Sequence, residues 1–392
     1  MKGLVLEGGG AKGAFHCGAV KALYDYGYKF NGVAGTSIGA INGAMIVQDS
    51  GYETMYNVWN HITVNEISNF DNNQFEKLFK KEYSRETIKY WSKQLLDTIK
   101  NVGIPADKIL NFLKTVIDED KIRKSEMDYA IVTYCLSDFM PLELFKEDIP
   151  MGELHNFIFA SAYYPAFKLQ KTNGKFYIDG GIYNNLPLNV LSKKREYSEI
   201  FAIRTMSKMP YKNITSENTK INYICPSEDL GNTLTLYNKS ILNNIKLGYY
   251  DALRFIKGYS GNKYYINGNA NFYNKIFKML SDTELEIVSN IYKLPQKNFF
   301  ECFKNKIIKS NKWNLLNHND FTLWFLETFA KFYGIEKFNV YTPKEFLKLI
   351  LYKTQNINYQ STLHLTKKNS DFHKDLNLLK ILIPKINEVL NG

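Results

Sequence analysis

Short apolar runs and helical patterns alternate along the first 260 residues of the chain. The run at 3–7 leads into a helical pattern at 15–23, and the run at 32–34 leads into another at 38–47. Such alternation is typical of parallel strands covered by helices on both faces. We therefore predict a three-layer α/β/α fold, with strands at residues 3–7, 32–34, 128–135, 142–145, 175–178, 199–203 and 221–224.

Two other regions carry helical patterns. Residues 51–124 are polar and mostly helical, and we expect them to form an insertion that covers a site on the sheet. From about Gly268 the pattern predicts helices alone, with helix starts at 280–284 and at 342–345. We therefore expect a catalytic domain at 1–262 and a helical domain at 263–392.

Charge is concentrated in the second of these domains. The chain has 392 residues and a net charge of +11, and residues 268–392 hold 18 lysines and no arginine against 11 acidic residues. A basic, aromatic-rich helical domain is suited to an anionic membrane surface, and it is equally consistent with an ordinary solvated surface. Because no nucleic-acid-binding motif accompanies the charge, we expect no nucleic-acid partner.

The cysteines and the hydropathy pattern indicate where in the cell the protein is expected. Four cysteines occur singly, which argues against a disulfide scaffold and against a zinc site: Cys17, Cys135, Cys225 and Cys302. No segment approaches eighteen uninterrupted apolar residues, and the first predicted strand begins at residue 3. We expect a cytoplasmic protein, without a signal peptide or a transmembrane segment, that meets membranes only at their surface.

A serine between two glycines lies where a predicted strand passes into a helix. Gly35-Thr36-Ser37-Ile38-Gly39 has the pattern of a nucleophile elbow, a sharp turn that holds a serine hydroxyl clear of the sheet. Glycine on either side lets neighbouring backbone approach without a clash with Cβ. By itself this five-residue pattern also arises by chance, so its weight depends on the rest of the chain.

A glycine-rich loop follows the first predicted strand. It consists of Gly8, Gly9, Gly10, Ala11, Lys12 and Gly13. Backbone N–H groups at a helix N-terminus bind anions: a dinucleotide pyrophosphate, a triphosphate or the oxyanion of an acyl-transfer intermediate. The first needs an acidic residue about twenty positions on, and the second needs Lys-Ser/Thr after the last glycine; both are absent. Two interpretations of the loop stay open: a site for the oxyanion, and a tight turn that binds no ligand.

Asp179 precedes Gly180 and Gly181 at the end of a predicted strand. Alone, an aspartate before two glycines is usually only a turn residue. As an ordered set, however, four blocks resemble the patatin-like phospholipase family, and the resemblance covers about residues 1–260. The blocks are Gly8 to Gly13, Gly35 to Gly39, Ala160-Ser161-Ala162 with Pro165, and Asp179-Gly180-Gly181 with Asn184, Asn185 and Pro187.

The resemblance implies a role for each block. Ser37 would be the nucleophile, Asp179 its partner in a Ser-Asp dyad, and the loop from Gly8 to Gly13 the oxyanion hole, with Gly35, Gly39, Gly180 and Gly181 shaping the turns. It implies a phospholipid or lysophospholipid substrate, no cofactor and no metal. Lys12 stands where the family more often has arginine. Because lysine cannot bind two acceptors with a planar fork as arginine does, a bidentate anchoring role is in doubt at this position.

Other functions stay open at this stage. A transacylase or a general carboxylesterase would use the same two residues, and a catalytically silent membrane-binding module would use neither. A Ser-His-Asp triad is the rival mechanism, but none of the six histidines lies in a catalytic motif: His16, His61, His155, His318, His364 and His373.

Overall fold

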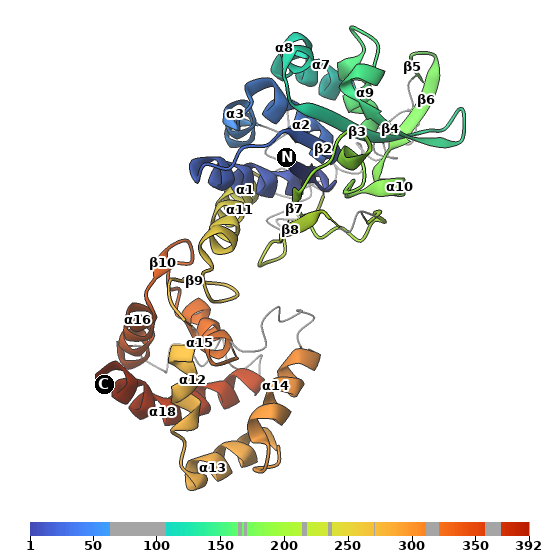
Figure 1. Ribbon diagram of the computed structural model, residues 1–392. Helices are drawn as coiled ribbons and strands as arrows, with labels where there is room; N and C mark the ends of the chain where they lie inside the picture. Colours follow the sequence, from blue (N-terminus) through green and yellow to red (C-terminus); the bar gives the residue numbers. More distant parts are fainter. Residues whose placement is uncertain are drawn as a thin grey trace, which may run out of the picture. The chain divides into compact units, whose positions relative to one another are not determined.

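The computed structural model (Figure 1) divides into two compact units, Met1–Ile256 and Lys257–Gly392. Much of the predicted insertion at 51–124, namely residues 63–106, lies outside the described residues. The division into a catalytic domain at 1–262 and a basic helical domain at 263–392 stays a prediction, and whether the second domain meets a membrane stays open. The structure describes residues 1–62, 107–163, 167, 171–213, 218–233, 237–269, 271–310, 321–356 and 370–391.

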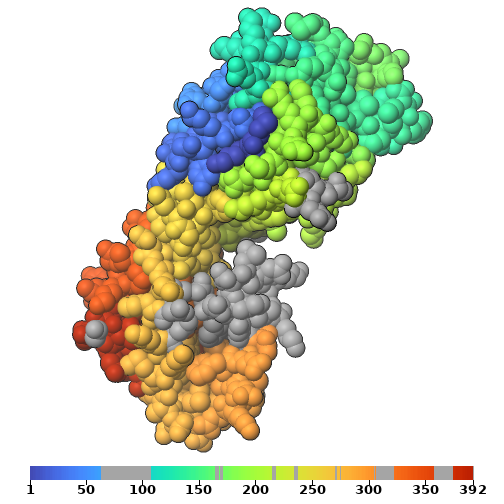
Figure 2. Space-filling view, in the orientation of Figure 1, coloured from blue at the N-terminus to red at the C-terminus, as the bar shows by residue number. Residues whose placement is uncertain are grey.

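The first unit is built on one large sheet. Its strands are β1 (Lys2–Leu6), β2 (Gly32–Thr36), β3 (Asp128–Cys135), β4 (Met140–Phe145), β5 (Lys171–Thr172), β6 (Lys175–Asp179), β7 (Glu199–Ile203) and β8 (Lys220–Ile224). The order is β5-β6-β3-β2-β1-β7-β8, with β4 also paired to β3. In the part of the sheet formed by β3, β2, β1, β7 and β8, every neighbouring pair is parallel, as expected. In Figure 2 the blue N-terminal residues accordingly lie against the yellow-green residues near 200.

The other part of the sheet corrects the expectation of parallel strands throughout. β4 and β6 both run antiparallel to β3, and β5 runs antiparallel to β6. The links from β3 to β4 and from β5 to β6 are too short for a crossover, which a parallel connection requires. Only four residues join β3 to β4, and β5 turns into β6 through Asn173 and Gly174, both with positive φ, as in a tight hairpin.

Helices cover both faces of this sheet and make the three predicted layers. On one face, α2 contacts β1, β2 and β3. On the other, Val5, Ala34 and Ala130 pack against Leu186 and Leu188, in the segment that follows α10. The helices are α1 (Ala14–Asp25), α2 (Ile38–Asp49), α3 (Glu53–His61), α7 (Asp107–Val116), α8 (Glu119–Lys124), α9 (Leu154–Ser161), α10 (Gly181–Asn184) and α11 (Asn238–Lys257), with 3₁₀ turns η1 (Gly10–Gly13), η2 (Lys146–Asp148) and η3 (Leu191–Lys193).

The second unit is mainly helical and has an aromatic-rich core of its own, which includes Phe325, Phe329 and Phe346. Both predicted helix starts are present, each with a capping box: Ser281 with Glu284, and Thr342 with Glu345. One prediction is wrong, because β9 and β10 form a small parallel pair. The elements are β9 (Tyr265–Ile266), α12 (Asn271–Lys278), α13 (Asp282–Tyr292), α14 (Phe299–Ser310), α15 (Phe321–Phe332), β10 (Val340–Tyr341), α16 (Pro343–Asn356) and α18 (Ser370–Asn391).

Candidate active site

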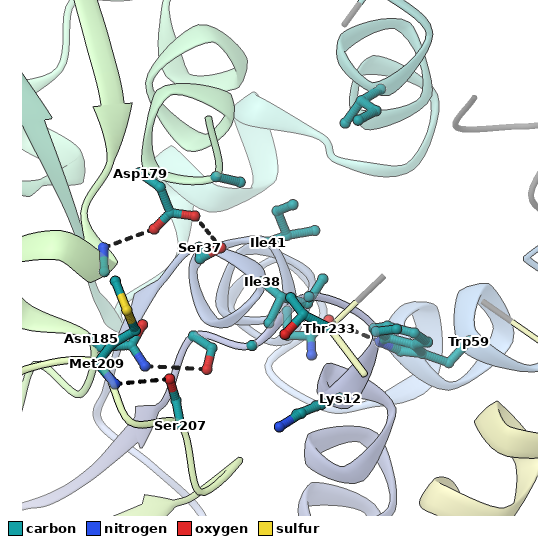
Figure 3. Close-up of a pocket in the computed structure, with 18 of the residues that line it drawn as sticks. Lys12, Ser37, Ile38, Ile41, Trp59, Asp179, Asn185, Ser207, Met209 and Thr233 are labelled. Atoms are coloured by element: carbon teal, nitrogen blue, oxygen red, sulfur yellow. Dashed lines mark hydrogen bonds between the residues drawn. The ribbon is translucent and has the colours of Figure 1, made fainter. Parts of the chain in front are cut away.

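Strand β3 brings Ser37 and Asp179 together. Strand β2 ends at Thr36, which pairs with Val132, and β3 continues past that end. The next β3 residue, Thr133, pairs with Asp179 at the end of β6. Two strands that approach from opposite directions therefore meet end to end along one side of β3. As a result the Ser37 hydroxyl donates a hydrogen bond to Asp179 Oδ2 at 2.6 Å, although 142 positions separate the two residues (Figure 3).

Ser37 has the strained backbone of a nucleophile elbow, with φ 58° and ψ −126°. Close approach of neighbouring backbone leaves no room for a side chain at either flanking glycine. A methyl group on Gly35 would lie 2.2 Å from the carbonyl of Gly39, and one on Gly39 would lie 2.2 Å from the carbonyl oxygen of Leu6. The Ser37 amide donates to the hydroxyl of Ser161 at 3.0 Å, so a partner from α9 also fixes the turn.

Asp179 is a buried carboxylate that accepts two hydrogen bonds. Its side chain is 8% exposed; Oδ1 accepts from the Gly181 amide at 2.8 Å, and Oδ2 accepts from Ser37. Burial penalises the charged form and raises the pKa of Asp179 from 3.8 to about 6, against the opposing effect of the two hydrogen bonds. The carboxylate is thus more basic than an ordinary aspartate and is still ionised at neutral pH.

The glycine-rich loop lies beside Ser37. A methyl group on Gly8 would be 3.2 Å from the Cβ of Ser37. Several amides of this loop already have protein acceptors: Gly8 donates to Asn185 O, Ala11 to Thr233 O and Lys12 to Gly9 O. The amides of Gly9 and Gly10 have no acceptor among the described residues, and both glycines line the cavity at Ser37.

A cavity of about 780 Å³ opens at these groups (Figure 3). Ser37, Asp179 and the loop from Gly8 to Lys12 lie at one part of its wall. Apolar side chains from three helices dominate the rest: Ile38, Ile41 and Met45 of α2, Val58 and Trp59 of α3, and Ile109, Phe112 and Leu113 of α7. A polar reacting end and an apolar body are what an acyl ester needs in a binding site.

His16, His61 and His155 form no hydrogen bond with Ser37 or Asp179. His16 is buried in α1 against Asn42, and its burial lowers its pKa to about 3. His61 and His155 contact main-chain carbonyls, and no described histidine lines the cavity. His318, His364 and the side chain of His373 lie outside the described residues. No cluster of metal-ligating side chains occurs in the described ranges. None of the described helices is long and apolar enough to cross a bilayer.

Some neighbours of the site could not be read from the sequence. In the sequence Ser161 is only one residue of a motif, yet its hydroxyl accepts from the Ser37 amide and donates to Val132 O at 2.6 Å. Glu7 and Thr205 stand in no motif of the sequence. The Thr205 hydroxyl donates to Gly8 O of the glycine-rich loop, and the Glu7 carboxylate accepts from the Thr205 amide. Both contacts depend on the pairing of β1 with β7, and no local pattern signals that pairing.

Comparison with known proteins relates the site to a family and to several relatives. Residues 4–192 match the family model described as "Patatin-like phospholipase". "Lysophospholipase nte1" of Aspergillus terreus is 48% identical over 54 residues, which are 14% of this chain and 4% of that protein. "Neuropathy target esterase sws" of Drosophila sechellia is 47% identical over 53 residues, again 14% and 4%. The chain thus spans only a small part of the length of these relatives.

Two solved structures are similar at low sequence identity. VipD from Legionella pneumophila matches with a TM-score of 0.41 and 13% identity, over 99% of this chain and 91% of that one. ExoU, in its complex with SpcU from Pseudomonas aeruginosa, matches with a TM-score of 0.35 and 13% identity, over 93% and 72%. The family match, with its blocks in the expected order along the described sheet, carries the assignment. Residues 4–192 of this chain form a patatin-like phospholipase domain.

Proposed function

We propose that this chain is a serine lipid acyl hydrolase that cleaves acyl esters of phospholipids or lysophospholipids. One observation carries the proposal: the Ser37 hydroxyl donates to a buried carboxylate at 2.6 Å where a largely apolar cavity begins. The family of residues 4–192 and the names of the partial relatives support a lipid ester as the substrate. Identity over so short a part of those relatives does not extend to their activities.

In the proposed reaction Asp179 acts as the base for Ser37. As the serine oxygen attacks the acyl carbonyl carbon, its proton passes to Asp179 Oδ2, and the carbonyl π electrons move onto the oxygen. The tetrahedral intermediate then collapses, the ester C–O bond breaks, and the alcohol leaves with the proton from Asp179. Water repeats the sequence on the acyl-serine and releases the fatty acid. A carboxylate with a pKa of about 6 is suited to both transfers near neutral pH.

The oxyanion would be held by the amides of Gly9 and Gly10. Three other amides of the loop predicted from the sequence already donate to protein acceptors, so they contribute less readily. Gly9 and Gly10 line the cavity together with Ser37. In other enzymes one such donor contributes about 3 kcal/mol of transition-state stabilisation.

The acyl chain would lie along one face of α2. Ile38, Ile41 and Met45 recur on that face at helical spacing and line the cavity, starting beside Ser37. Helix α2 rises 1.5 Å per residue, so Met45 lies about 12 Å further along the axis than Ser37. Side chains of α3 and α7 complete an apolar wall, which suits a hydrocarbon chain and would not suit a polar one.

The rim of the cavity supports a membrane surface as the source of the lipid. Three apolar side chains that line the cavity are also exposed: Ile182, Met206 and Met209, at 41%, 54% and 42%. Lys208 lies between the two methionines and is exposed as well. Apolar side chains next to a lysine are suited to the boundary between head groups and acyl chains of an anionic membrane.

Product analysis tests this proposal directly. Wild-type protein and the variant Ser37→Ala are incubated with defined phospholipids and lysophospholipids, and the products are identified by mass spectrometry. Free fatty acid from the wild type and none from Ser37→Ala is the expected result. Ser50→Ala is the matched control, because Ser50 also has positive φ and lies at the other end of α2.

The same samples separate the alternatives. Acyl chains that appear on an added alcohol acceptor instead of as free acid would indicate a transacylase. Turnover of short water-soluble esters with none of phospholipids would indicate a general carboxylesterase. Failure of a serine-reactive fluorophosphonate to label Ser37, together with no product, would indicate a silent membrane-binding module and would refute the proposal.

A further inference from the structure

Strands β1 and β7 place Thr205 beside the glycine-rich loop. They run parallel, and their last pair in register is Leu6 with Ile203. Two residues later the chain reaches Gly8 on one side and Thr205 on the other. The Thr205 hydroxyl donates to the carbonyl oxygen of Gly8 at 2.6 Å, and the side chain is 1% exposed. This hydroxyl therefore hydrogen-bonds to the loop from the side that faces the protein interior, and Thr205 does not line the cavity.

A second donor reaches the same carbonyl. Asn185 Nδ2 donates to Gly8 O at 3.3 Å, while the Asn185 carbonyl accepts from the Gly8 amide at 3.0 Å. A trans peptide holds its C=O and N–H on opposite sides. Fixing the oxygen of Gly8 therefore fixes the direction of the Gly9 N–H, which points away from Thr205 and has no acceptor among the described residues.

We propose that Thr205 is a positioning residue for the oxyanion site, because its hydroxyl fixes and polarises the Gly8–Gly9 peptide whose N–H serves the acyl oxyanion. This inference rests on the proposed function. A hydrogen bond accepted by a peptide oxygen makes the N–H of the same peptide a better donor, so the hydroxyl acts on strength as well as on direction. Thr205 itself touches neither the substrate nor Ser37.

Glu7 keeps the hydroxyl of Thr205 in place. Its side chain is 0% exposed, and Oε2 accepts from the amides of Thr205 at 2.6 Å and Met206 at 3.1 Å. Arg204 Nε donates to the same oxygen at 2.9 Å and balances the charge. The packing is also tight, because a methyl group on Gly9 would lie 2.7 Å from Thr205 Oγ1. The hydroxyl has little room for another orientation.

Kinetics on three variants test this role with p-nitrophenyl butyrate, a water-soluble ester that needs no membrane. Thr205→Val replaces the hydroxyl by a methyl group of similar size, and Thr205→Ser keeps the hydroxyl. Thr354→Val is the matched control, because Thr354 is a buried threonine of the second unit whose hydroxyl also donates to a carbonyl. Thermal unfolding is measured for each protein, and Thr205→Ala replaces the valine variant if that variant does not fold.

We expect Thr205→Val to lower kcat by about 10- to 100-fold with KM within about twofold of wild type, because the lost interaction acts in the transition state. Thr205→Ser and Thr354→Val should stay within about threefold of wild type. A trifluoromethyl ketone, which forms a tetrahedral adduct with serine, should bind Thr205→Val more weakly by a factor similar to the loss in kcat/KM. A merely structural role would not move these two quantities together.

Two results would overturn the inference and leave the proposed function standing. One is a Thr205→Val enzyme within threefold of wild type while Ser37→Ala is inactive. The other is a Thr205→Ser enzyme as slow as Thr205→Val, since the hydroxyl would then not be the operative group. A wild-type protein without any esterase activity would instead refute the proposed function, and this inference with it.

Discussion

Burial of Asp179 predicts where activity is lost on the acid side. The proposed base must be ionised to accept the proton of Ser37, and burial raises its pKa to about 6. Activity should therefore fall as the pH falls through 6, about two units above the pKa of an ordinary aspartate. The direction follows from the role: protonated Asp179 can still hydrogen-bond to Ser37, but it can no longer take up a proton.

The size of the effect follows from the ionised fraction. A group with a pKa of 6 is about half ionised at pH 6, about one-eleventh ionised at pH 5 and about one-hundredth at pH 4. We therefore expect kcat/KM to drop about tenfold between pH 7 and pH 5. A solvent-exposed aspartate, with a pKa of about 3.9, would still be more than nine-tenths ionised at pH 5, and the rate would hardly change.

The assay measures kcat/KM for a short-chain p-nitrophenyl ester from pH 4 to pH 8 at constant ionic strength. This parameter reports the ionisation of the free enzyme, in which the raised pKa applies. Each sample is returned to pH 7 and assayed again, so that reversible protonation is separated from acid unfolding. A fluorophosphonate titration of Ser37 gives the concentration of active sites at every pH.

A midpoint near 4 would refute the reasoning, because Asp179 would then not be a desolvated base. A midpoint near 6.5 that disappears in His61→Ala or His155→Ala would refute it in another way, since an imidazole would be the base. His16 does not titrate in this range, because its burial lowers its pKa to about 3. Under our proposal the acid limb persists in both histidine variants.

Three further predictions follow from the same site. Asp179→Asn should be inactive and yet unfold at a higher temperature than wild type at pH 7. The raised pKa means that the folded state favours the neutral acid by about 3 kcal/mol, and wild type has this stabilisation below pH 3.8 and loses it as the pH rises through 6, whereas the neutral amide keeps it. Equal unfolding temperatures at pH 7 would contradict this. Met45→Trp should shorten the preferred acyl chain in a chain-length series, whereas Met45→Leu should not; an unchanged preference would exclude the α2 face as the chain site. His16→Ala should keep esterase activity within a few-fold, and inactivity without unfolding would point to a triad.

Local sequence was enough to predict one half of the sheet and the turn at Ser37. The apolar run at 32–34, the flanking glycines and the small residues of α2 are all short-range signals, and the structure has the strand, the turn and the helix in that order. Strand direction is not a short-range signal. The runs at 142–145 and 175–178 were recognised as strands, but their antiparallel pairing depends on connection length and on which edge of β3 was free.

Contacts between distant segments account for the rest of what the sequence did not reveal. Ser161 and Thr205 are ordinary residues by type. Ser161 matters because α9 packs against β3 beside Ser37, and Thr205 matters because the pairing of β1 with β7 brings it to Gly8. The sequence predicts only that an insertion at 51–124 covers a site, not which side chains form the apolar wall of the cavity. Its residues in α3 and α7 are indistinguishable in sequence from those that face the interior of any amphipathic helix.

The proposed dyad without histidine is chemically reasonable because the backbone would perform the orienting work that a third side chain performs in a triad. In a triad one group positions the base and the base then positions the nucleophile. Here the Gly181 amide fixes one oxygen of Asp179, and the other oxygen is left for Ser37. The strained turn and Ser161 fix Ser37 independently. Since the pairing with β3 already sets the distance between the two residues, an imidazole between them would have no space and no further task.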